Sequence, residues 1–160
     1  TMSKLFGDWG KFRRVLTDLK DNREQYEGVV ISIADKIVER IWDIIEAQEP
    51  DFAPLVEEYR QRKIREGYDE RIMIKTGDYL NSITVKDIQS NGDELFVFIG
   101  FEDKETETGI KMTELAEYLE YGTSKMPARY SITQSWEIMK NDIKKEVAGR
   151  LKAVIGDDLR

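Results

Sequence analysis

Two residue types are missing from this 160-residue chain: it contains no cysteine and no histidine. Without cysteine the chain forms no disulfide and has no thiol nucleophile, and without both residues it lacks the usual ligands of a zinc site. The absence of histidine also removes imidazole, the side chain that most often moves protons at neutral pH. Catalysis would depend on carboxylates, lysine, serine, threonine or tyrosine alone. We therefore expect a protein that is not an enzyme and that uses no metal or other cofactor.

The common signatures of nucleotide-binding and hydrolytic sites are missing as well. The sequence has no phosphate-binding loop ending in Gly-Lys-Ser/Thr, no dinucleotide glycine pattern, no Gly-x-Ser-x-Gly and no Ser-x-x-Lys. No stretch approaches the ~20 apolar residues that a membrane-spanning helix needs, and the first residues contain no apolar signal-peptide core. We expect a soluble protein without a membrane partner, made in the cytoplasm.

Charge is unevenly distributed along the chain. The 32 acidic and 25 basic residues give a net charge of −7, which argues against a general nucleic-acid binder because phosphate binding needs a basic surface. Residues 87–120 alone hold ten acids and two bases, so this stretch carries −8 and the rest of the chain is near +1. A local field of one sign usually has a function or faces open water.

Apolar residues at helical spacing predict three helices in the first half of the chain. A short helix is expected over residues 8–21, a long one over residues 26–47 and a charged one over residues 54–66. The long helix has apolar residues beyond its main face, so we expect it to be contacted on more than one side, and Pro50 requires it to end. Residues 71–75 predict a short strand.

The second half of the chain predicts a β-hairpin. We expect Thr76 to cap a single helical turn that runs into a strand over residues 83–89. The Asn-Gly pair within residues 90–93 predicts a tight turn, and residues 95–101 form the return strand. This return strand is apolar on both faces, so we expect it to be covered on both sides, either by the chain's own helices or by another subunit.

Two helices are expected after an acidic, threonine-rich loop over residues 102–109. The first spans residues 113–121 and ends with Gly122 as its C-cap, and the second continues to about residue 154. Ser131 and Gln134 would form a capping box at the start of the second helix.

These elements predict one α+β domain over the whole chain. Several helices, including one long one, would pack on a small antiparallel sheet. The N-terminal part, at about residues 8–66, is helical, and the α+β part covers about residues 68–155.

Four acids cluster in the acidic loop, at Glu102, Asp103, Glu105 and Glu107. Their oxygens are ligands that Mg²⁺ or Ca²⁺ would accept. However, their spacing does not match a calcium-binding loop, and Lys104 lies among them. We favour a solvated acidic loop over a metal site.

The segment from Leu115 to Arg129 carries the most information. A helix end with a left-handed glycine would be followed by an extended loop, braced by Pro127, that points Lys125, Met126 and Arg129 outward. Two cations beside an exposed methionine suit docking to a partner. Composition alone favours a simpler interpretation, an ordinary connection between two helices.

A resemblance changes that balance. Glu-x-Gly-Thr at residues 120–123, followed by a short loop and Pro-Ala-Arg at 127–129, resembles the signature of the phage tail-completion family, whose members are also described as head–tail joining, virion-morphogenesis or minor tail components. Residues 76–83 are similar to that family's Thr-Gly-x-Leu-x-x-Ser-Ile element, with one residue more between glycine and leucine. The two motifs occur in the family's order, about forty residues apart with a hairpin between them, and the match covers residues 76–155.

The chain also departs from the family pattern. Tyr130 stands where the family has a second proline, and Ser131 stands at the aromatic position that follows. The first 70 residues have no counterpart in the resemblance.

The resemblance implies a structural protein in the neck of a tailed phage or a related prophage element. Such proteins complete the tail end or join head to tail as rings of non-catalytic subunits. The implied partners are connector, tail-tube and terminator proteins together with further copies of this chain in a homo-oligomeric ring. The implied location is the virion neck or tail, after synthesis in the bacterial host cytoplasm.

The resemblance also implies a contact loop made of Glu120, Gly122, Thr123, Lys125, Met126, Pro127 and Arg129. Lys125 and Arg129 would pair with acids of the next subunit, so reversing the charge of Arg129 is expected to abolish assembly and leave the fold intact. Glu102, Asp103, Glu105 and Glu107 would face a channel, where their charge repels the phosphates of passing DNA. No sequence-specific binding of nucleic acid is expected.

Two alternatives stay open at this point. One is a small acidic soluble module that binds a basic protein, as a regulator or a partner that mimics phosphate. The other, which the missing histidine disfavours, is a hydrolase or nuclease based on carboxylates and metal ions. The sequence leaves open the ring size, the state of the isolated protein, which surface meets head or tail, the tail type, the host and the role of the first 70 residues.

Overall fold

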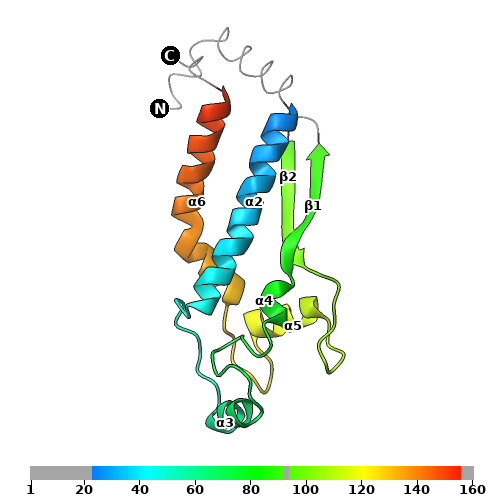
Figure 1. Cartoon of the computed structure of the whole chain (residues 1–160), viewed down its shortest axis with the longest axis vertical. Coiled ribbons are helices and arrows are strands. Elements are labelled where there is room, and N and C mark those ends of the chain that lie inside the picture. The colour runs from blue at the N-terminus through cyan, green and yellow to red at the C-terminus, as the bar shows by residue number, and fades with distance from the viewer. Residues whose placement is uncertain (1–22, 92–93, 156–160) are drawn as a thin grey trace.

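The computed structural model describes residues 23–91 and 94–155, so the helix predicted over residues 8–21 lies outside the described residues. Two long helices lie side by side, and a β-hairpin runs along the other side of the first of them (Figure 1). The helices are α2 (Arg23–Glu46) and α6 (Ser131–Ile155), and the strands are β1 (Ile83–Asn91) and β2 (Glu94–Phe101). The predicted α+β class, with a long helix packed on a small antiparallel sheet, is confirmed.

Three shorter helices gather at the end of the molecule farthest from the start of α2 (Figure 1). They are α3 (Glu57–Arg65), α4 (Asp78–Asn81) and α5 (Met112–Tyr121). Among the described residues, no helix is long and apolar enough to cross a membrane.

Helix α2 forms the centre of the molecule, within three residues of the predicted bounds at each end. Its isoleucines recur at helical spacing and four of them are buried: Ile33, Ile41, Ile44 and Ile45. Each fully buried isoleucine contributes roughly 1.5–3 kcal/mol relative to an exposed one. The helix contacts both α6 and the hairpin, which confirms the expected contacts on more than one side. It ends before Gln48, whose φ is 54°, two residues ahead of Pro50.

One hydrophobic core joins α2, the base of the hairpin, α4, α5 and α6. Its buried members outside α2 include Tyr79, Leu80, Ile83, Leu119, Met139 and Ile143. The core lies between elements that are distant in the sequence, so α5 and the start of α6 are fixed against α2 and the hairpin base.

The hairpin has one covered face and one open face. Its strands pair from Ile83 opposite Phe101 to Asn91 opposite Glu94. In β2 the side chains alternate: Leu95, Val97 and Ile99 are half-buried, whereas Phe96 and Phe98 are 44% and 48% exposed. Within residues 23–91 and 94–155, the helices therefore cover only one face of β2, and cover of the other face by another subunit stays a prediction.

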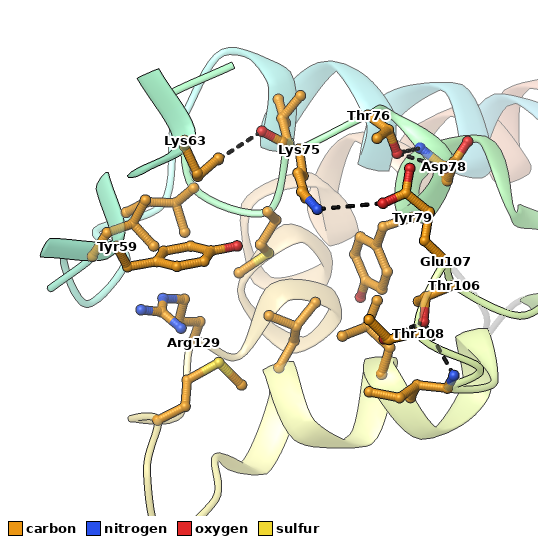
Figure 2. Close-up of a pocket in the computed structure, with 18 of the residues that line it drawn as sticks. Tyr59, Lys63, Lys75, Thr76, Asp78, Tyr79, Thr106, Glu107, Thr108 and Arg129 are labelled. Atoms are coloured by element: carbon orange, nitrogen blue, oxygen red, sulfur yellow. Dashed lines mark hydrogen bonds and ion pairs between the residues drawn. The ribbon is translucent and has the colours of Figure 1, made fainter. Parts of the chain in front are cut away.

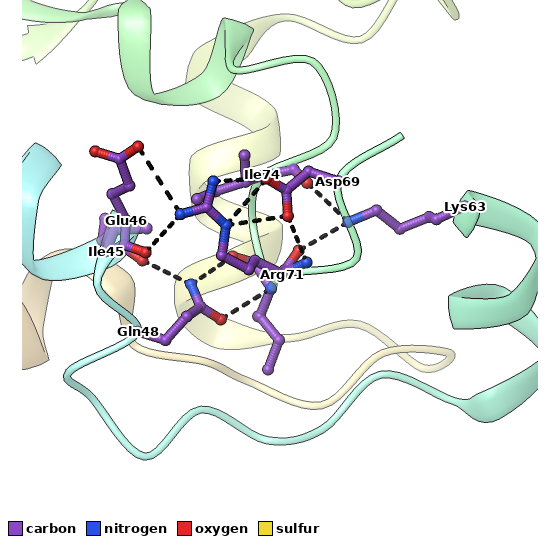
Figure 3. A network of polar contacts seen from close by, with 8 residues as sticks. Ile45, Glu46, Gln48, Lys63, Asp69, Arg71 and Ile74 are labelled. Carbon is purple, nitrogen blue, oxygen red and sulfur yellow. Dashed lines mark hydrogen bonds and ion pairs between the residues drawn. The ribbon is translucent and has the colours of Figure 1, made fainter. Parts of the chain in front are cut away.

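The strand predicted over residues 71–75 is absent, because side chains take the backbone groups that a neighbouring strand would pair (Figure 3). The Gln48 amide donates from Nε2 to the carbonyl of Ile72 at 3.1 Å and accepts the Ile72 N–H at its Oε1 at 2.9 Å. Lys63 Nζ donates to the carbonyl of Arg71 at 2.8 Å. The segment is thereby held as an irregular loop, and this prediction is wrong.

The cap predicted for the helical turn is displaced by one residue. The N-cap of α4 is Gly77, with φ 87°, and it makes no side-chain capping bond. The hydroxyl of Thr76 still accepts the N–H of Asp78 at 3.3 Å, so it supports the turn from one position earlier than predicted.

Candidate functional site

The joint between α5 and α6, residues 120–133, contains much of the motif that suggested a function. Glu120 is 8% exposed and points at the start of α6. One carboxylate oxygen accepts the N–H of Ile132 and the other accepts the N–H of Thr133, both at 3.0 Å, and the hydroxyls of Ser131 and Thr133 also donate to it. A carboxylate suits the unpaired N–H groups and positive dipole of a helix start. Glu120 therefore caps α6 and is not presented to a partner.

The same contacts correct the predicted capping box. Ser131 is the first residue of α6 rather than the residue before it, and its hydroxyl points to Glu120. Among the described residues, Oε1 of Gln134 has no hydrogen-bond partner. Glu120, at the end of the preceding helix, supplies the cap instead. It lies too far from Ser131 in the sequence for a local motif to predict it.

Tyr79 joins this arrangement from α4. Its hydroxyl lies 2.9 Å from the hydroxyl of Ser131. Burial, the largest effect, raises the pKa of Tyr79 to about 12; the bond to Ser131 opposes the shift and the charge of Glu120 adds to it. The hydroxyl therefore stays protonated at neutral pH.

Gly122 is required by the close return of the chain after α5. Its φ is 77° and its ψ 178°, which is not the left-handed conformation that was predicted. A Cβ on this residue would lie 2.7 Å from the N of Ala128 and 2.8 Å from the carbonyl oxygen of Met126. Only glycine fits here, both for its conformation and for the space. Gly122 thus shapes the loop.

Arg129 is buried, at 4% exposure, and the prediction that it points outward is wrong. Its Nε donates to the carbonyl of Ala53 at 2.9 Å and its Nη2 to that of Pro54 at 3.3 Å. Burial lowers the pKa of the guanidinium, and Tyr59 opposes that shift. Arg129 ties the joint to the segment before α3, so we now expect its charge reversal to destabilise the fold.

The rest of the predicted contact loop is more accessible. Thr123, Lys125 and Pro127 are exposed and Met126 is half-buried. Thr123 and Met126 face each other across a tight turn, with the Thr123 N–H donating to the Met126 carbonyl at 2.8 Å. Lys125 is therefore the one charged residue of the predicted loop that lies at the surface.

The four acids of the predicted channel face do not act as one cluster. Glu102 pairs with Lys104, and Glu107 pairs with Lys75 at 3.5 Å, whereas Asp103 and Glu105 are exposed. Within residues 23–91 and 94–155, no three acids gather closely enough to hold a metal ion.

A cavity of about 600 Å³ brings several predicted residues together. It lies between α3, the loop before α4, the acidic loop, α5 and the segment after Gly122. Figure 2 shows Tyr59 and Arg129 on one side, Tyr79 and Glu107 on the other, and Lys75 between them. Of the predicted site residues it is lined by Glu107, Lys125, Met126, Pro127 and Arg129. Glu120, Gly122 and Thr123 are not part of its lining, nor are Glu102, Asp103 and Glu105.

Most of the cavity wall is apolar, and its charged residues are mainly cations. The apolar residues include Leu55, Val56, Ile72, Ile74, Ile110, Met112, Leu115 and Leu119. The cations are Arg62, Lys63, Lys75, Lys125 and Arg129, against two carboxylates, Asp78 and Glu107. Apolar walls with a few convergent polar groups are typical of a binding pocket.

Lys63 is the residue that sequence reasoning missed. It is 3% exposed, and its Nζ donates to the carbonyls of Arg71 and Ile74, each at 2.8 Å (Figure 3). Burial lowers the pKa of its ammonium group, although the charge of Asp69 opposes this. A signal was present: Lys63 lies seven residues after Val56, on the helical face that points at the cavity.

Comparison of the chain with protein-family models, curated proteins and solved structures found no match. The function is therefore argued from the motifs and from the geometry above.

Proposed function

We propose that this chain is a non-catalytic structural subunit of a tailed-phage neck, which completes the tail end or joins head to tail as a homo-oligomeric ring. The proposal rests on the resemblance over residues 76–155 and on one structural observation, the open face of the hairpin. Its partners would be connector, tail-tube or terminator proteins, and its place the virion neck or tail.

The outer hairpin face is defined here by Phe96 and Phe98 of β2, which lie opposite Gln89 and Asp87 of β1. A two-stranded sheet on its own is marginally stable, and α2 covers just one side of this one. Two half-exposed phenylalanines on one strand form an apolar stripe that a neighbouring subunit would bury. This face takes the role that the sequence had given to Arg129 and Glu120.

The exposed acids keep their proposed role in this arrangement. Asp103 and Glu105 are exposed, and both belong to the stretch that carries most of the chain's negative charge. If this surface lines a channel, like charge keeps DNA from adhering to it during passage. A reconstruction of the neck with this loop on its outer rim would contradict that placement.

Electron microscopy of the parent phage with this gene disrupted tests the proposal. We expect filled heads and separate tails, which rejoin when the protein is supplied in trans. Normal intact particles would contradict the structural role and favour the alternative, an acidic module that binds another protein.

A further inference from the structure

Helix α3 stands apart from the body of the molecule (Figure 1). The cavity lies between them, and Figure 2 shows residues that line it. It is held by Lys63, bonded to the carbonyls of Arg71 and Ile74, and by Arg129, bonded to Ala53 and Pro54 just before the helix. The cavity is open to solvent, and its volume of about 600 Å³ lies within the ordinary range of a ligand-binding pocket.

The charges around this space indicate the sign of what would fill it. Lys63 and Arg129 are both more than nine-tenths buried, and both line the cavity. Their printed bonds go to carbonyl oxygens, and in the described part of the chain neither forms an ion pair with a carboxylate. The charge of Asp69 acts on Lys63, whereas no carboxylate is among the causes of the pKa shift of Arg129. A buried cation without a counter-ion is costly, so an anion beside Arg129 would be stabilised. This local excess of positive charge occurs in a chain whose net charge is −7.

The rim indicates an occupant larger than a small molecule. Val56 is 66% exposed and Tyr59 37% exposed, and both also line the cavity. Apolar surface thus continues from the inside of the cavity onto the outside of α3. A ligand confined to the cavity would leave this outer surface uncovered, whereas a polypeptide segment would cover both.

The ends of this chain do not fit that role. Both α2 at its start and α6 at its end lie at the far end of the molecule from α3 (Figure 1), and α2 alone is 24 residues, about 36 Å, long. Residues 1–22 carry five bases and three acids, so their charge is of the wrong sign.

We propose that the cavity is a docking site for an acidic, apolar peptide segment of a second polypeptide. The apolar side chains of that segment pack on Ile74, Leu119 and Tyr59, and its carboxylates face Lys125 and the buried Arg129. The site is separate from the outer hairpin face, so it does not depend on the assignment to a phage neck.

A displayed library of random dodecapeptides, selected in parallel against three folded proteins, tests this proposal. They are the unaltered chain, Ile110→Trp, which fills the cavity from the half-buried wall, and Ile138→Trp, a matched change on the exposed surface of α6. We expect peptides that bind the unaltered chain and Ile138→Trp but not Ile110→Trp, and that contain more Asp and Glu than Lys and Arg. Circular dichroism confirms that each variant is folded before selection.

Charge changes then test the contacts. Lys125→Glu is expected to weaken binding of a selected peptide by about tenfold, and replacing that peptide's acids by amides by a similar factor. Lys145→Glu, an exposed change on α6, is expected to have no effect. Selected peptides that are neutral or basic, or that bind Ile110→Trp equally well, would overturn the proposal, as would a library that gives no binder. Binding of decanoate in the absence of any peptide binder would assign the cavity to a free amphiphile instead.

Discussion

The α5–α6 joint and the outer hairpin face differ in the kind of side chain that each buries and exposes. In the joint, Glu120 and Arg129 are buried and bonded to backbone groups. Gly122 lies where a Cβ atom would clash with the backbone. On the outer hairpin face, Phe96 and Phe98 remain half-exposed on a strand that needs cover. The charged residues of the motif thus make contacts within the chain, whereas an apolar strand keeps one open face.

The largest effect on this comparison is expected from Arg129→Glu. It places a carboxylate among the carbonyls of Ala53 and Pro54, with no counter-charge beside it. We expect a loss of about 4 kcal/mol in the free energy of unfolding, or a failure to fold, measured by urea denaturation. Lys125→Glu, in the same loop but exposed, serves as the control and is expected to change stability by less than about 0.5 kcal/mol. Equal stability of the two variants would contradict the burial of Arg129.

Gly122→Ala is expected to have the next largest effect. The new methyl group meets backbone atoms of Ala128 and Met126, and the conformation is strained for any side chain. The expected loss is about 3 kcal/mol, from strain and close packing together. Gly109→Ala is a matched control because Gly109 also has φ 77° but a Cβ there meets nothing within 4 Å, so about 1 kcal/mol is expected. Similar losses for both variants, compared by thermal unfolding, would show that space at Gly122 does not matter.

The stability of the joint at alkaline pH is expected to depend on the buried Tyr79. Its pKa is about 12 in the folded chain against an ordinary value of 10, so the folded chain holds the proton more tightly. This stabilisation is complete below pH 10 and is lost as the pH rises toward 12, a change of about 2 kcal/mol. Urea denaturation from pH 9 to 12 measures it. Tyr79→Phe should flatten this part of the profile, whereas Tyr130→Phe, at an exposed position, should not. If the free energy of unfolding falls with pH in Tyr79→Phe as it does in the unaltered chain, other groups cause the loss of stability at alkaline pH.

Periodicity was sufficient to predict α2, α6 and the two strands of the hairpin, because each depends on a local pattern of apolar residues. It failed where a side chain from far along the sequence replaces a local interaction. Glu120 caps a helix that begins eleven residues later, and Gln48 pairs with the backbone of Ile72, 24 residues away. Both pairs of partners lie much farther apart in the sequence than the three or four residues over which a helical pattern is read.

The site was predicted only in part for a related reason. Exposure of a charged side chain is the ordinary expectation, so Arg129 was assigned to the surface and Lys63 was not singled out. Their burial depends on carbonyl groups supplied by loops at residues 53–54 and 71–74, which come together only in the folded chain. Lys125 is exposed as predicted, whereas Met126 is half-buried, and both line a cavity that the sequence did not predict.

The most direct test of the account is complementation of the gene-disrupted phage with two variants of this chain. The first combines Phe96→Thr and Phe98→Thr, which keep the strand propensity of the hairpin and remove its apolar stripe. The second, Ile138→Thr, alters an equally exposed residue on α6. We expect both proteins to fold, with stability changes of no more than about 1 kcal/mol, and only the second to restore joined particles. Full restoration by the Phe96→Thr, Phe98→Thr protein would contradict the claim that this chain assembles through the outer hairpin face.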